Sequence, residues 1–201
     1  IANRKQNLGA RIDAGCSLDA CSVSLNALKA NLVPSLDLYA DVIREPAFRK
    51  ADIERKRGQW IAGIAREKSR PMTMGLRVLP PLLFGKEHAY GIPLTGSGSV
   101  ASIKSLTAAD MRGFMHDWIR PDNVTLLVAG DTTLEQVLPK LNAAFGDWKA
   151  PATPVPDKNL AHVDLPDHVR VFLMDRPDAK QTLILAGWVA PSTKAADEKA
   201  I

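Results

Sequence analysis

The sequence predicts an α+β fold in which helices pack on a mainly antiparallel sheet. Two patterns indicate this class: short segments alternate apolar and polar side chains, and longer segments repeat apolar residues at helical spacing. The strand-like segments come in neighbouring pairs or beside pairs of helices, rather than in strict alternation with helices. The composition of the 201 residues, 46% hydrophobic and 24% charged, is that of an ordinary globular protein.

The first elements predicted are a short helix and a β-hairpin. The opening residues are typical of the last turns of a helix that Gly9 ends. Residues 9–28 then alternate as two strands around a turn at residues 17–19. Cys16 and Cys21 flank that turn, where the Cα atoms of facing cysteines come within disulfide range. Two small, half-buried thiols are the alternative.

Three helices are predicted next. The first begins at Pro34 and ends before Pro46, and the second covers about residues 50–69. The basic face of the second helix is interleaved with acidic side chains, which favours a solvated surface over a binding surface. The third helix covers residues 72–84, where Pro80-Pro81 predicts a kink or an early stop.

The following elements are a loop, two helices and a strand. Residues 85–99 are rich in Gly and Pro, and Thr107 is predicted to cap an amphipathic helix. Val124 to Ala129 are mainly apolar, which predicts a buried strand. A further helix follows and is closed by Gly146.

The last part of the chain is predicted to be a linker, two strands and the start of a helix. Residues 149–167 hold four prolines and little periodicity, which is typical of a linker. Val169 to Met174 and Thr182 to Val189 are predicted strands, and Thr193 is a candidate cap for a helix beginning near the end. We therefore expect the sequence to be a piece of a longer polypeptide.

Several function classes are disfavoured by composition and motifs. A net charge of +4, from 26 basic and 22 acidic residues, is too small and dispersed for a nucleic-acid-binding protein. No apolar stretch approaches the roughly 18 residues of a membrane span. The four histidines have no common metal-ligand spacing. Gly96 to Ala101 match G-x-G-x-x-A, but no predicted strand runs into them, so a nucleotide loop is disfavoured.

Taken together, the segments resemble the pitrilysin/insulinase family of zinc metallopeptidases, which includes the mitochondrial processing peptidases and core subunits of the cytochrome bc1 complex. Each motif is short, but their order and spacing over about 190 residues make the resemblance specific. The motifs are Leu8-Gly9-Ala10, Val23-Ser24-Leu25, Pro46-Ala47-Phe48, Ile53-Glu54-Arg55, His88-Ala89-Tyr90-Gly91-Ile92-Pro93, Arg120-Pro121-Asp122-Asn123, Val128-Ala129-Gly130-Asp131 and Phe145-Gly146-Asp147-Trp148.

The resemblance implies a domain organisation. Each half of such a peptidase contains two similar α+β lobes. It implies that residues 1–148 form a first lobe without its N-terminal part, that residues 149–167 are a linker, and that residues 168–201 begin a second lobe. Active halves bind zinc through H-x-x-E-H and a glutamate on a later helix, with the glutamate of the motif as general base. That motif would precede residue 1.

The later ligand position falls within this sequence. In active members it precedes an isoleucine and lies eight residues before a proline, so Ile64 and Pro71 place it at Gly63. A second acidic position of the family falls on Lys56. Glycine offers no oxygen ligand, and lysine repels Zn²⁺. The nearest acid, Glu67, lies one helical turn later and needs a register shift to serve.

This pattern indicates the non-catalytic half of a two-part zinc endopeptidase, with no catalytic or metal-binding residue of its own and no activity alone. We expect it to form a substrate chamber for peptides with an active, zinc-binding half, either fused or separate. A structural or assembly subunit without any peptidase partner is the alternative. The family resemblance favours the bacterial periplasm, where a Cys16–Cys21 disulfide is permitted.

Overall fold

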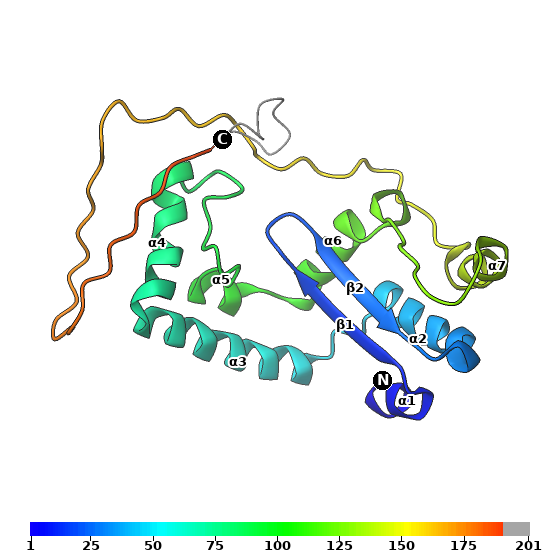
Figure 1. Cartoon of the computed structure of the whole chain (residues 1–201). Helices are drawn as coiled ribbons and strands as arrows, with labels where there is room; N and C mark the ends of the chain where they lie inside the picture. Colours follow the sequence, from blue (N-terminus) through cyan, green and yellow to red (C-terminus); the bar gives the residue numbers. More distant parts are fainter. Residues whose placement is uncertain (191–201) are drawn as a thin grey trace. The chain divides into compact units, whose positions relative to one another are not determined.

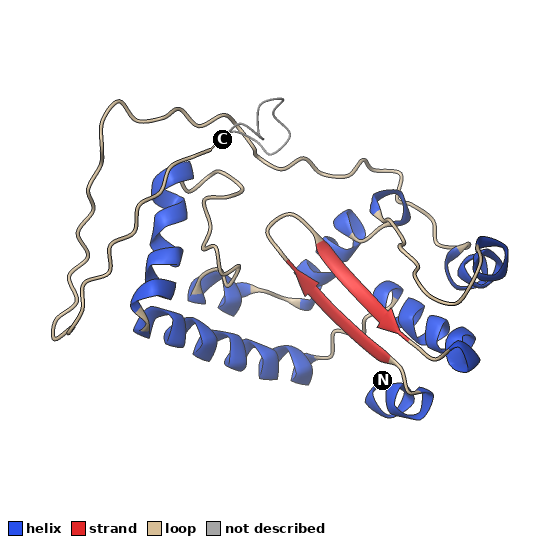
Figure 2. Ribbon diagram, viewed as in Figure 1, coloured by secondary structure: helices blue, strands red, loops and turns tan. Residues whose placement is uncertain are grey.

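The computed structural model describes residues 1–190 and confirms the α+β class: in this range, seven α-helices accompany a two-stranded antiparallel sheet (Figures 1 and 2). The helix expected from Thr193 lies outside the described residues. The α-helices are α1 (Ala2–Leu8), α2 (Leu32–Arg44), α3 (Lys50–Ser69), α4 (Pro71–Phe84), α5 (Val100–Ser105), α6 (Ala108–Trp118) and α7 (Leu134–Phe145); the strands are β1 (Arg11–Cys16) and β2 (Cys21–Asn26); and two 3₁₀ turns cover Lys29–Asn31 and Pro121–Asn123.

The chain divides into two compact units. The first unit comprises Ile1–Lys56 and Ser105–Asp157, and the second comprises Arg57–Lys104 and Lys158–Ile201. Helix α3 contributes its first residues to the first unit and the rest to the second. The division into a first lobe, a linker and a second lobe remains a prediction.

The predicted hairpin forms at the start of the first unit. Gly9 ends α1 in the left-handed conformation, at φ +60°, which a residue without a Cβ adopts at little cost. Strands β1 and β2 then pair antiparallel, with Ile12 opposite Leu25 and Cys16 opposite Cys21. Alternation of the side chains therefore places Ile12 on the buried face, as the pattern predicted.

Helix α2 carries the core of the first unit. Its buried residues Leu36 and Ala40 pack with Ala144 of α7, and Leu25 of β2 joins them. The Tyr39 hydroxyl donates a hydrogen bond to the Val23 carbonyl over 2.7 Å, which fastens α2 to the hairpin beside it (Figure 1). Burial raises the pKa of that hydroxyl, so it remains a donor at neutral pH.

The predicted cap of α6 is confirmed as a capping box. The Thr107 hydroxyl accepts a hydrogen bond from the Asp110 backbone N–H over 3.2 Å, and the Asp110 carboxylate accepts one from the Thr107 backbone over 2.7 Å. Both contacts satisfy donors that a helix N-terminus leaves free. Hydrogen bonds from Thr107 lower the pKa of Asp110, which keeps its carboxylate ionised.

Of the two outcomes expected at Pro80-Pro81, the early stop is wrong, because α4 continues to Phe84 with both prolines inside the helix, and the kink stays a prediction. Pro80 has no N–H to donate to the carbonyl of Leu76, four residues earlier. In the structure, the backbone N–H of Leu94 donates to that carbonyl over 3.1 Å. The loop after the helix thus supplies the missing hydrogen bond, and the helix can continue.

The three later strands were also predicted wrongly. Val124 to Ala129, Val169 to Met174 and Thr182 to Val189 run as loop segments in the described chain, drawn in tan in Figure 2. Leu127 and Leu173 are 93% and 95% exposed, so these apolar runs are not buried strands here. An apolar run signals β-propensity, but a strand also needs a neighbour to hydrogen-bond with. Within residues 1–190, the sheet consists of β1 and β2.

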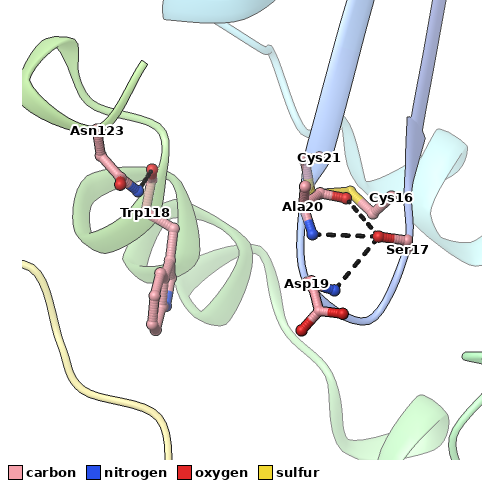
Figure 3. The surroundings of a disulfide bond; sticks show 7 residues. All are labelled: Cys16, Ser17, Asp19, Ala20, Cys21, Trp118 and Asn123. Carbon is pink, nitrogen blue, oxygen red and sulfur yellow. Dashed lines mark hydrogen bonds between the residues drawn. A yellow bond between two sulfur atoms is a disulfide. The ribbon is translucent and has the colours of Figure 1, made fainter. Parts of the chain in front are cut away.

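A disulfide joins Cys16 and Cys21 across the turn end of the hairpin (Figure 3). The turn itself is held by Ser17. Its backbone N–H donates to the Ala20 carbonyl over 2.8 Å, and its hydroxyl oxygen accepts from the backbone N–H groups of Asp19 and Ala20. The crosslink therefore closes a short loop that is already hydrogen-bonded.

We expect the double variant Cys16→Ser/Cys21→Ser to lower the free energy of unfolding by about 2 kcal/mol, the loop-closure entropy of so short a ring. Urea unfolding measures this loss, with Ser22→Ala on the same exposed hairpin as the control. Thiol titration of the unfolded, unreduced chain should find no free thiol. Finding two would contradict the crosslink.

Candidate functional site

Helix α3 carries the position that the resemblance assigns to a zinc ligand. Gly63 lies in the second half of this helix, next to the fully buried Ile64, and Lys56 lies two turns earlier with its side chain exposed. A Cβ added at Gly63 would meet only the Arg66 Nη2 atom, at 3.9 Å. Packing around the Cβ position therefore does not require a glycine there.

The residues at these two positions of α3, Gly63 and Lys56, do not fit zinc. Zn²⁺ binds thiolate, imidazole or carboxylate groups, and neither glycine nor a lysine ammonium provides one. Among residues 1–190, no three His, Cys, Asp or Glu side chains are grouped so as to hold a metal ion. No step of zinc chemistry can therefore be assigned to these positions.

Glu67, the nearest acid to Gly63 on the C-terminal side, is engaged elsewhere. Its carboxylate accepts an ion-paired hydrogen bond from Arg77 of α4 over 2.6 Å, and further hydrogen bonds from Ser97 over 2.7 Å and from Thr95 over 3.2 Å. The Arg77 side chain is only 9% exposed. A register shift that turned Glu67 toward a metal would leave this buried guanidinium without its counter-charge, which is costly.

The Glu67–Arg77 pair also holds the glycine loop that follows α4. Arg77 Nη2 donates to the Gly98 carbonyl over 2.6 Å, Arg77 Nη1 donates to the Ser97 hydroxyl, and Trp60 Nε1 donates to the Ser97 carbonyl over 2.9 Å. Ser97 is buried, between Gly96 at φ +67° and Gly98 at φ +65°. The two glycines that resembled a nucleotide motif instead allow the chain to fold Ser97 onto the ion pair.

The electrostatics of Glu67 result from opposing effects. Burial by itself raises the pKa of the carboxyl group, but the hydrogen bonds from Ser97, Arg77 and Thr95 and the charge of Arg77 outweigh it. The pKa of Glu67 is therefore lower than that of an ordinary glutamate. The sequence analysis missed Arg77, Thr95 and Ser97, since residues 10 to 30 positions from Glu67 carry no periodic signal.

Comparisons with known proteins indicate the class of protein that the chain resembles. Residues 105–201 match the family model described as the Peptidase M16 inactive domain. The chain is 28% identical over 146 residues to a probable zinc protease PqqL of Haemophilus influenzae, covering 69% of this chain and 15% of that protein. Residues 105–201 thus match an M16 inactive domain, and the chain as a whole is similar to zinc proteases.

Solved structures of M16 proteins share the fold. The peptidase M16 inactive domain from Pseudomonas fluorescens superposes with a TM-score of 0.73 at 24% identity, over 82% of this chain and 39% of that one. The periplasmic protease PqqL from Escherichia coli gives a TM-score of 0.66 at 18% identity, over 84% of this chain and 19% of that one. The chain thus spans well under half the length of these relatives.

We expect Glu67→Gln to lower the free energy of unfolding by about 2 kcal/mol at neutral pH, the range for hydrogen bonds to a charged group. A lowered pKa in the folded state stabilises the protein above the unfolded pKa, and this contribution is lost as pH falls through the folded value. The difference between variant and parent should therefore shrink at about pH 3.

Urea unfolding at both pH values measures this effect, and Glu87→Gln is the matched control, because Glu87 is an exposed glutamate of the same unit. An equal loss at both pH values would show that the Glu67 charge does not contribute.

Gly63→Ala should raise the free energy of unfolding by about 0.5 to 1 kcal/mol, since the new methyl group has space and alanine favours the helix. Gly91→Ala is the contrast, because a Cβ there would lie 1.8 Å from the Gly85 carbonyl oxygen. That variant should lose about 1 to 3 kcal/mol in thermal or urea unfolding. Destabilisation by Gly63→Ala would mean that the glycine is needed structurally.

Proposed function

We propose that this M16 inactive domain is part of the non-catalytic half of a two-part zinc metallopeptidase and closes on an active half to form a chamber for peptides. The observation that carries the proposal is Gly63. The ligand position has space for a Cβ atom but carries no ligand. In this proposal α3 binds no metal and serves only the fold and the contact with the active half, which binds the zinc.

The contacts of Glu67 also support a non-catalytic role for this half. The acid that could approach the ligand position is part of the ion pair that stabilises α3, α4 and the glycine loop. In this proposal the active half supplies the zinc ligands and the general base, and it adds the peptide to a sheet edge as an extended strand. The present chain confines that peptide.

We place this pairing in the bacterial periplasm. The similarity to a periplasmic protease of Escherichia coli supports this location, and so does the Cys16–Cys21 disulfide, because such crosslinks persist in oxidising compartments. Within residues 1–190, none of the helices combines the length and the apolar character needed to cross a membrane.

Reconstitution tests the proposal. The full chain and an H-x-x-E-H-containing half from the same genome are purified separately, and cleavage of a quenched fluorescent peptide is measured for each half and for the mixture. The mixture should cleave about tenfold faster or more than the active half alone, since confinement positions the substrate. The chain alone should neither cleave peptide nor hold zinc in elemental analysis.

The matched variants are Gly63→Ala and Lys56→Ala, which should leave the stimulation unchanged because neither residue supplies a ligand. Stoichiometric zinc on this chain, or cleavage by it alone, would overturn the proposal. A chain that assembles with other proteins but stimulates no active half would instead be a structural subunit.

A further inference from the structure

The first unit contains a small pocket that neither the family resemblance nor the proposed function uses. It has a volume of about 210 Å³ and lies between the C-terminal ends of α2 and α6 and the segment after α7. By the share of about 30 Å³ that a water molecule takes in the liquid, the pocket has room for a small organic molecule rather than a single water.

Among the described residues, three cationic side chains and His116, which contacts Asp117 over 2.9 Å, line this pocket, and no carboxylate does. Arg120 is 3% exposed, Arg44 is partly buried with 23% of its side chain exposed, and Lys149 is exposed at the rim. The rest of the lining is mainly apolar and includes Ile43 of α2, Met115 of α6, and Ile119 and Trp148. The pocket therefore offers positive charge beside an apolar wall.

Arg120 supplies an unsatisfied donor. Its Nε and Nη2 atoms bind the Asp122 carboxylate over 2.6 and 2.7 Å, and Nη2 also donates to the Pro151 carbonyl over 3.0 Å. The Nη1 atom is buried and has no hydrogen-bond partner among the described residues. A buried guanidinium nitrogen without an acceptor is costly, so an acceptor oxygen supplied by a ligand would be stabilising.

The charge balance indicates the class of ligand. Asp122 neutralises Arg120, and Asp147, 2.8 Å from Nη1 of Arg44, neutralises Arg44. The hydrogen bonds from these arginines lower the pKa of both aspartates, which therefore stay ionised. The charge of Lys149 also acts on Asp147, and that of Asp117 acts on Arg120. Because Lys149 forms no ion pair of its own among the described residues, it is the cation most available to a ligand, and the pocket suits one negative charge rather than two.

We propose that this pocket binds a monocarboxylate that carries a short apolar group, with Arg120 Nη1 and Lys149 holding the carboxylate and Ile43, Met115 and Trp148 covering the apolar group. Such a group occurs in a free short-chain acid and at the C-terminal residue of a peptide. The carboxylate supplies the acceptor that Nη1 lacks among the described residues, and the apolar wall gains contact with the tail.

Titration of the isotope-labelled full chain by NMR tests this proposal, with isovalerate as the free acid and N-acetyl-leucine as the peptide end. Both ligands should shift the methyl signals of Ile43 and Met115 and the indole signal of Trp148 in a saturable way. Their neutral amides should not. Tighter binding of N-acetyl-leucine would identify a chain end, and tighter binding of isovalerate a free acid.

Two pocket variants and one control complete the experiment. Lys149→Ala should weaken binding about two- to fivefold, the range for an exposed charge pair. Arg120→Lys should weaken it about tenfold or more, because a lysine cannot present the same donor while it holds Asp122. Lys104→Ala, on an exposed lysine of the second unit, should change nothing.

Lys149→Ala keeps the test decisive if Arg120→Lys fails to fold. Absence of saturable shifts, equal binding of the acids and their amides, or inorganic phosphate binding more tightly than isovalerate would overturn the proposal.

Discussion

The ion pair between Glu67 and Arg77 is the interaction on which the second unit depends. It joins α3 to α4 and extends through Ser97 and Gly98 into the loop after α4. Because Arg77 is almost fully buried, its charge must be matched by Glu67 and by nearby acceptors. That requirement fixes the rotation of α3 at Glu67, and with it the side of the helix on which Gly63, one turn earlier, lies.

Loss of the ligand position and retention of the fold are therefore compatible. Gly63 contributes no contact that the helix needs, whereas Ile64 beside it is completely buried. The helix keeps its packing residue and omits the oxygen ligand that the resemblance places at position 63. Helix α3 is held by the packing of Ile64 and by the ion pair of Glu67 with Arg77.

Hydrogen bonds from distant loops also explain two unusual backbone features, the prolines inside α4 and the positive φ angles of Gly96 and Gly98. Helix α4 continues through Pro80 because the Leu94 N–H replaces the missing hydrogen bond to Leu76. Gly96 and Gly98 adopt positive φ because Ser97 must reach the carboxylate of Glu67. In both cases a loop distant in sequence satisfies a polar group of a helix, and the loop gains its own conformation from that contact.

The sequence by itself determined the elements that depend on neighbouring residues. Thr107 and Asp110 specify the start of α6, Gly9 specifies the end of α1, and alternation specifies the β1–β2 hairpin, because capping and pleating act over a few residues. Motif order likewise indicated the M16 family.

Only the tertiary structure decided which apolar runs pair as strands, how Glu67 is engaged and where Arg120 meets a pocket. Those outcomes depend on partners 10 to 30 or more residues away, whose position no local pattern encodes.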